Sequence, residues 1–306
     1  MPLPPLFNPS NDMALAANLR QYSPPKRIQQ MEADLAALAQ LWTDGPWGWS
    51  LATKRRYQQM GVSAELLPSD EWLAEVRRLS SREFACRYLH DLLRKLDDGR
   101  LLGHAMAYHT ERDGLGAGVQ IYKSPGSSSG RGVFTSAPLT EEQVRTRLEG
   151  FLRTQGAYVS DRYYADKTLD FALEFWVHAD HRVEFLGYSV FHTEGSGAYG
   201  YNLVSSQEQL RALIDFDPAL LARLIEYHQG HLGQTAYHGP VGIDLLRTSQ
   251  SLHPVVEINF RMNMGILAIL LYNMYGANAT VQLTPLRPGG FEARIAAGRL
   301  EIVYAG

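Results

Sequence analysis

An acid, an amide and a guanidinium recur at alternate positions in the segment 255–265. In a β-strand, alternate side chains point to the same face of the sheet. A strand over 255–261 would therefore place on one face Val255, Glu257, Asn259 and Arg261, and on the other Val256, Ile258 and Phe260. The first face can do chemistry, because it sets oxygen ligands beside a fixed positive charge. The second can join a core.

A second acid comes from the segment just upstream. Residues 241–247 also read as a strand, and the polar link 248–251 favours a hairpin that sets Asp244 opposite Glu257. Two facing carboxylates repel each other unless a positive charge lies between them. A divalent cation would resolve this conflict, and two acids with the Asn259 amide suit Mg²⁺ better than zinc, with Mn²⁺ as a second candidate. The alternative is a surface hairpin whose acids are solvated.

A run of small residues follows Lys123, which stands at the end of an alternating strand. Small side chains let backbone N–H groups approach phosphate oxygens, and a lysine adds a point charge. The segment 127–132 is not a Walker A loop, because no Gly-Lys-Ser/Thr closes it and a second strand begins near Val133. A flexible linker is the alternative, but two strands this close together favour a hairpin.

A further positive charge lies at the start of a predicted helix. The residues from Ser80 to Glu83 form a capping-box pattern, and an apolar stripe continues the helix to about Lys95. Arg82 in the first turn opposes the helix dipole, whereas an anion bound at that end would be held by the free N–H groups and the guanidinium together. A solvated surface arginine is the alternative.

The composition describes an ordinary soluble globular protein. Its 306 residues are 45% hydrophobic and 20% charged, with a formal net charge of −3. Lysine and arginine are scattered, which disfavours nucleic acid as a partner. The single cysteine, Cys86, cannot form an internal disulfide, and the most apolar run, 265–274, is too short to span a bilayer. We therefore expect a cytoplasmic protein with no membrane partner.

The expected elements fall into three groups along the chain. Residues 1–79 combine helices with short strands at 47–51 and 63–67, which predicts a small α/β layer. The middle group contains the hairpin after Lys123, a helix capped by Thr140 and a strand within 157–164. The last group pairs strands 169–178 and 182–192, adds helices that begin near Ser205 and Asp217, and ends in the acid-bearing hairpin.

This order, with Lys123, the Ser/Gly loop and the Glu257-x-Asn259-x-Arg261 segment, resembles the ATP-grasp superfamily. The resemblance implies an α/β and α+β protein: an ATP-grasp fold preceded by an N-terminal α/β domain. It implies an N-terminal domain over 1–79, a small lid subdomain over 80–160 and a large subdomain over 161–306. ATP would lie between the two subdomains, with Mg²⁺ bridging its phosphates.

The resemblance also implies residue roles. Lys123 would contact the α- and β-phosphates, and Arg82 would replace the lysine that the family usually supplies. The lid loop over the phosphates would consist of Ser127, Ser128, Ser129, Gly130, Arg131 and Gly132. Adenine and ribose would be bordered by Ser160, Asp161 and Tyr163. Asp244, Glu257 and Asn259 would hold the metal, and Arg261 would steady the transferred phosphoryl group.

Most members of that superfamily are carboxylate-amine ligases, so the resemblance implies ATP-dependent amide formation through an acyl-phosphate, with release of ADP and phosphate. A small-molecule kinase on the same scaffold and a catalytically silent nucleotide-binding protein are the alternatives. The partners would be a small-molecule or peptide carboxylate and an amine. The candidate substrate residues are Asn8, Asn11, Asp12, Arg20, Tyr199 and Asn202; neither these residues nor the rest of the sequence identifies the two substrates or the oligomeric state.

Overall fold

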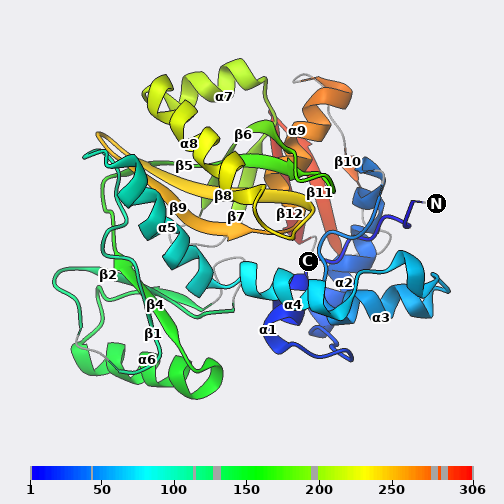
Figure 1. The fold of residues 1–306 in the computed structure, drawn as a ribbon, viewed down its shortest axis with the longest axis horizontal. Coiled ribbons are helices and arrows are strands. Elements are labelled where there is room, and N and C mark those ends of the chain that lie inside the picture. Colours follow the sequence, from blue (N-terminus) through cyan, green and yellow to red (C-terminus); the bar gives the residue numbers. More distant parts are fainter. Residues whose placement is uncertain are drawn as a thin grey trace.

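An eight-stranded antiparallel sheet lies at the centre of the structure (Figure 1). The computed structural model describes residues 2–42, 44–112, 115–126, 132–193, 199–276, 282–283 and 289–304. Within these residues the strands are ordered β10-β11-β12-β7-β6-β5-β8-β9. Their bounds are β5 Lys167–Val177, β6 Val183–Thr193, β7 Tyr199–Leu203, β8 Gly239–Thr248, β9 Leu252–Asn259, β10 Gln282–Leu283, β11 Phe291–Ala296 and β12 Arg299–Tyr304.

A smaller antiparallel sheet lies at the lower left of Figure 1, beside helix α6 (Glu141–Gln155). Its strands are ordered β1-β4-β2-β3, with bounds β1 Ala107–His109, β2 Gln120–Lys123, β3 Val133–Thr135 and β4 Tyr158–Arg162. Lys123 pairs with Val133, so the predicted hairpin is confirmed. The capping box of Thr140 with Gln143 is also confirmed, and Val144 and Leu148 bury one stripe of α6 against this sheet.

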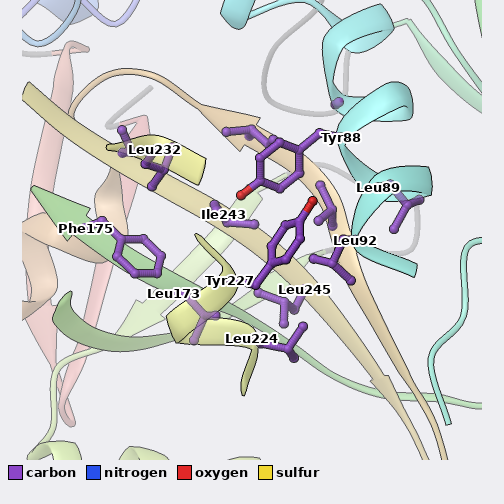
Figure 2. Packing of buried hydrophobic residues seen from close by; sticks show 14 of the residues in the cluster. Tyr88, Leu89, Leu92, Leu173, Phe175, Leu224, Tyr227, Leu232, Ile243 and Leu245 are labelled. Atoms are coloured by element: carbon purple, nitrogen blue, oxygen red, sulfur yellow. The ribbon is translucent and has the colours of Figure 1, made fainter. Parts of the chain in front are cut away.

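One face of the large sheet is covered by α5 (Arg82–Leu96), α7 (Gln207–Ile214) and α8 (Pro218–Leu232). Alternate residues of β5, Leu173 and Phe175 among them, point into this core because a strand directs every second side chain to the same face. In Figure 2 the ring of Tyr88 from α5 lies beside that of Tyr227 from α8, with centroids 5.6 Å apart. The side chains between helices and sheet thus form one continuous apolar layer.

The N-cap residues determine where three of the helices begin. Asp217 caps α8 and Pro218 follows it, as the sequence predicts. The helices α5 and α7 begin one residue later than predicted, because the second serine of each pair caps the helix. Ser81 accepts a hydrogen bond from Phe84 N, and Ser206 accepts one from Gln209 N.

The opposite face of the sheet carries helix α9 (Met264–Tyr275), the helix α2 (Lys26–Asp34) and the 3₁₀ helix η1 (Ala36–Leu41). Leu267 of α9 packs with Leu38 of η1 and with Trp47 in a second apolar cluster. α9 is apolar and spans 12 residues. In the described part of the chain, no helix combines the length and apolar character needed to cross a membrane.

The N-terminal segment differs from its prediction. Residues 2–42 and 44–79 form the helices α1 Asn11–Ala17, α2, η1, α3 Leu51–Gln59, η2 Ala64–Leu66 and α4 Asp70–Leu79, with a single bridge between Leu6 and Pro46. The strands predicted at 47–51 and 63–67 are wrong. Ser50 accepts a hydrogen bond from Thr53 N and starts α3, and 64–66 make one 3₁₀ turn. Short apolar runs carry too little periodicity to separate these outcomes.

The β8–β9 hairpin forms with the predicted register. Asp244 pairs with Glu257, and Gly242 pairs with Asn259. The prediction that Val255 shares the face of Glu257 is wrong, because the next pair is Leu246 with His253 and β9 has extra residues between the two pairs. This irregularity turns Val255 into the core with Ile258 and Phe260, while Asp244 and Glu257 face the other way.

Replacing a side chain in the apolar layer tests this packing. Leu173 is fully buried on β5, so Leu173→Ala should lower the free energy of unfolding by about 3 kcal/mol through lost burial and a residual cavity. The matched control is Leu213→Ala on α7, where the leucine is 50% exposed and the loss should stay within about 0.5 kcal/mol. Urea unfolding measures both, and equal losses would contradict the assignment of Leu173 to the core.

Candidate active site

A cavity of about 530 Å³ lies against the face of the large sheet that carries α9. Its floor includes Glu174 of β5, Asp244 of β8 and Asn259 of β9, whose neighbours in sequence point into the opposite core. Its other wall comes from the N-terminal segment and from β7, β11 and β12. The residues predicted to hold a metal and to steady a phosphoryl group are thus brought together in one cavity.

Arg261 is held in the cavity by hydrogen bonds from all three of its side-chain nitrogens. Its Nε donates to Asp12 Oδ1 at 2.7 Å, one terminal nitrogen donates to Asn259 Oδ1 at 2.8 Å, and the other donates to the Met262 carbonyl at 2.9 Å. Burial alone would lower the pKa of Arg261, but the charges of Asp12, Glu257 and Asp244 outweigh it and raise that pKa. The guanidinium is therefore a fixed cation with a fixed orientation.

The acids that face each other across the hairpin lie beside this cation. Asn259 Nδ2 donates to Asp244 Oδ2 at 3.3 Å, which ties the predicted ligand set together. Burial, followed by the charges of Glu257 and Glu174, raises the pKa of Asp244 well above its ordinary value. A bound cation would relieve that repulsion. The two carboxylates fit a hard divalent ion such as Mg²⁺, whereas the amide of Asn259 turns its Nδ2 toward Asp244 and its Oδ1 toward Arg261.

The described residues contain no group of three or more His, Cys, Asp or Glu side chains placed to hold a metal ion. The predicted set is consistent with this, because only two of its three members are acids and the third is Asn259. Ions such as Mg²⁺ usually take one or two protein carboxylates and complete their shell with water and phosphate oxygens. The assignment of Asp244, Glu257 and Asn259 as ligands remains a prediction.

Glu174 is a cavity residue to which the sequence analysis gave no role. The residue is 1% exposed, and its carboxylate accepts hydrogen bonds from Ser189 Oγ and Asn263 Nδ2, each at 2.7 Å. Burial raises its pKa to about 7, although both hydrogen bonds favour the charged form. The sequence could have pointed to Glu174, because it is an acid in the middle of a predicted strand in which Leu173 and Phe175 flank it.

Glycine completes the surroundings of Glu174. A Cβ at Gly265, the second residue of α9, would overlap the Glu174 carboxylate and Ser189, and one at Gly242 would overlap Asn263 and Glu174. Only glycine lets the backbone of α9 and β8 approach this closely. The carboxylate is therefore held by backbone shape as well as by hydrogen bonds.

Two cations meet beside Glu257 from other elements. A terminal nitrogen of Arg82, in the first turn of α5, lies 3.2 Å from Glu257 Oε1. Lys123 Nζ donates to the Val256 carbonyl at 3.4 Å and is almost fully buried. Burial, then the charge of Arg82, lowers the pKa of Lys123. An anion bound here would be attracted by both cations and would reverse that effect.

The loop predicted to cover phosphates is described only at its last residue. Residues 127–131, which include Ser127, Ser128, Ser129, Gly130 and Arg131, lie outside the described residues. Gly132 has a φ of 67°, a conformation that glycine adopts without steric cost, and its carbonyl accepts a hydrogen bond from Ser124 N at 2.8 Å. The role of this loop remains a prediction.

The three residues predicted beside adenine and ribose lie along and just after β4. Ser160 Oγ lies 2.8 Å from His109 Nε2, and Tyr163 is 44% exposed. Asp161 is buried and its Oδ2 lies 2.9 Å from Nε2 of His253 on β9, a contact between the two sheets that the sequence did not indicate. None of the three lines the cavity described above. Their contact with a nucleotide remains a prediction.

The predicted substrate residues divide into two groups. Asp12, Tyr199 and Asn202 line the cavity. Asn8 and Asn11 are buried in the N-terminal segment, where Asn8 Nδ2 donates to the Gly48 carbonyl at 2.9 Å, and Arg20 pairs with Asp70 on the surface. The structure separates Asn8, Asn11 and Arg20 from this cavity, and all three line a different cavity within the N-terminal segment.

Solved structures share this fold, although no known family model and no curated protein matches the sequence. A biotin carboxylase from Campylobacter jejuni, solved as a β-γ-ATP complex, aligns over 76% of this chain and 51% of its own, with 13% identity and a TM-score of 0.51. The chain has the ATP-grasp fold. At this identity the likeness concerns the ATP-grasp fold alone.

Other ATP-grasp structures align as well. Pyruvate carboxylase from Rhizobium etli, solved with acetyl coenzyme A, aligns over 66% of this chain and 17% of its own, with 13% identity and a TM-score of 0.51. N5-carboxyaminoimidazole synthetase from Staphylococcus aureus, complexed with ADP, aligns over 83% of this chain and 59% of its own, with 12% identity and a TM-score of 0.45. This chain spans about half the length of the biotin carboxylase that it matches.

The pKa of Glu174 gives a testable pH dependence. In the unfolded chain this group ionises near 4.5, and in the fold near 7, so the folded state retains a proton between those values. Stability should therefore fall as the pH rises through this window, by about 3 kcal/mol in total. Glu174→Gln should remove this loss, measured as the difference between variant and wild type in urea unfolding at pH 4.5 and 7.5.

The matched control is Glu226→Gln, because Glu226 is exposed on α8 on the other side of the sheet. It should follow the wild-type pH dependence. A Glu174→Gln curve that also runs parallel to the wild type would show that the raised pKa is wrong.

Proposed function

We propose that this protein is an ATP- and Mg²⁺-dependent carboxylate-amine ligase that forms an amide through an acyl-phosphate. The observation that carries the proposal is the meeting of Asp244, Glu257, Asn259 and Arg261 at one cavity, with Arg82 and Lys123 beside Glu257. Such a set can neutralise the charge of a triphosphate at the point where a phosphoryl group is transferred. The ATP-grasp fold is consistent with this assignment.

The positive side chains have distinct tasks in this proposal. Lys123 and Arg82 come from elements outside the large sheet and would contact phosphate oxygens near Glu257. Arg261, fixed by Asp12, would stabilise the charge that develops on the transferred phosphoryl group. Asp244, Glu257 and Asn259 would hold Mg²⁺, which would supply positive charge to offset that of the phosphates.

The reaction then proceeds in two balanced steps. A substrate carboxylate oxygen attacks the γ-phosphorus and ADP leaves, which gives an acyl-phosphate. The amine nitrogen attacks the acyl carbon and phosphate leaves, while the amine loses a proton to phosphate or water. No step needs a protein nucleophile. The walls contributed by β7, β11 and the N-terminal segment would keep water from the activated acyl group.

The test is the nucleotide product and its dependence on both substrates. Purified protein should release ADP and phosphate only when an acid and an amine are present together, and the amide should be found by mass spectrometry. AMP as product would contradict the proposal. A product that has gained a phosphoryl group and no amide bond would identify a kinase, and nucleotide binding without turnover across a broad panel would identify a silent binder.

The second test changes one acid of the hairpin. Glu257→Gln keeps the shape of the side chain but removes its charge, so turnover should fall on the order of a hundredfold or more, because the metal ion loses an anionic ligand and Arg82 loses its carboxylate partner. The measurement is ADP release at saturating substrates, with thermal unfolding to confirm the fold. The control Glu226→Gln makes the same chemical change on exposed α8 and should keep wild-type turnover. Equal turnover in all three proteins would contradict a catalytic role.

A further inference from the structure

The cavity has two chemically different ends. At one end lie the carboxylates of Glu174, Asp244 and Glu257 with Arg261. At the other end, towards β11 and β12, lie apolar side chains, among them Met31, Phe291 and Ile302, and a second guanidinium, that of Arg27, whereas Trp47 lies between the ends, because its carbonyl accepts a hydrogen bond from Met262 N. A molecule that fills the cavity must therefore match a polar reaction end, an apolar middle and an outer cation.

Arg27 is placed to bind an anion. Its guanidinium carbon lies 5.5 Å from the ring centroid of Phe291 and 5.0 Å from that of Tyr304. Stacking on two rings limits how the guanidinium can turn, while its N–H groups remain able to donate in their own plane. No salt bridge to Arg27 is found among the described residues, whereas Arg261 and Arg82 each have a carboxylate partner. The N–H donors of the Arg27 guanidinium are thus available to a ligand in the cavity.

The opposite end is suited to an amine. Glu174 accepts hydrogen bonds only from the neutral groups of Ser189 and Asn263, and no cation pairs with it in the described part of the chain. Asp244 and Glu257 are assigned to the metal ion in the proposed function, and Arg82 and Lys123 lie beside Glu257, so Glu174 is the acid of this end that is left to face a substrate. A substrate amine beside Glu174 would find a hydrogen-bond acceptor there.

We propose that the amine substrate also carries a carboxylate, which Arg27 binds, and an apolar body that packs between Trp47 and Phe291. Its chemical class is an amino acid or short peptide with an apolar side chain and a free carboxylate. This inference rests on the proposed ligase function and adds the identity of one substrate. Arg27 is a specificity residue in it, since it contacts the substrate away from the reacting atoms.

The first experiment compares amines that differ only in the outer group. Leucine, phenylalanine and alanyl-phenylalanine are each paired with their carboxamide, and ADP release is measured with a panel of acids. The free carboxylates should give a KM lower by about tenfold or more than the carboxamides, because a charge-assisted bidentate contact is lost in the amide. The amino acid and dipeptide arms show which length spans the cavity.

The second experiment removes the guanidinium. Arg27→Gln should raise the KM of the free carboxylates to that of the carboxamides and leave carboxamide kinetics within about twofold, and Arg27→Lys should retain part of the preference. The matched control is Lys26→Gln, which removes a charge from the neighbouring exposed position of α2 and should behave as wild type. Thermal unfolding of each variant reports on the fold.

Two results would overturn the inference. One is equal use of free carboxylates and carboxamides by the wild type, and the other is an Arg27→Gln variant that loses both classes of amine equally. If no substrate pair releases ADP, the ligase proposal fails. Calorimetric binding of the same amines to wild type and Arg27→Gln then decides separately whether Arg27 recognises a carboxylate. If the amines bind wild type and Arg27→Gln equally, or bind neither, the inference is overturned. If the free carboxylates bind the wild type more tightly than Arg27→Gln, the inference holds for a protein that is not a ligase.

Discussion

The concentration of negative charge on one face of the large sheet is the constraint on which the site depends. Glu174, Asp244 and Glu257 lie on neighbouring strands, and Glu174 has almost no contact with solvent. Carboxylates removed from water repel each other and cost free energy unless hydrogen bonds or cations compensate them. The surrounding structure supplies that compensation through Asn263, Ser189 and two arginines. The fold is thus organised to hold charges that a stable core alone would exclude.

That compensation comes from elements far apart in the sequence. Arg82 reaches Glu257 from α5, and Lys123 reaches the β9 backbone from the small sheet. The buried contact between Asp161 and His253 joins the same two sheets a short distance away. The groups proposed to receive phosphates therefore lie where the small sheet meets the large one. A change in the relative position of these sheets would alter the phosphate contacts directly.

Periodicity and spacing predicted the part of the site that local rules govern. The strand pattern and the polar link were enough to set Asp244 opposite Glu257, and the Lys123 hairpin followed from two strands that bracket a short loop. Contacts between distant segments were not predictable in this way. Nothing local to Glu174 shows that α9 and Ser189 enclose it, and nothing near Asp12 shows that Arg261 binds it. The irregular register that buries Val255 also depends on pairing beyond one strand.

The bond between Asp12 and Arg261 joins α1 to the end of the acid-bearing hairpin, 249 residues later. Helix α1 therefore contributes directly to the wall of the cavity that carries the acids. Exchange of this segment between related proteins would succeed only when the incoming segment carries an acid at the position of Asp12. In evolution Asp12 and Arg261 must therefore change together, because the Arg261 guanidinium binds both helix α1 and the acid-bearing hairpin.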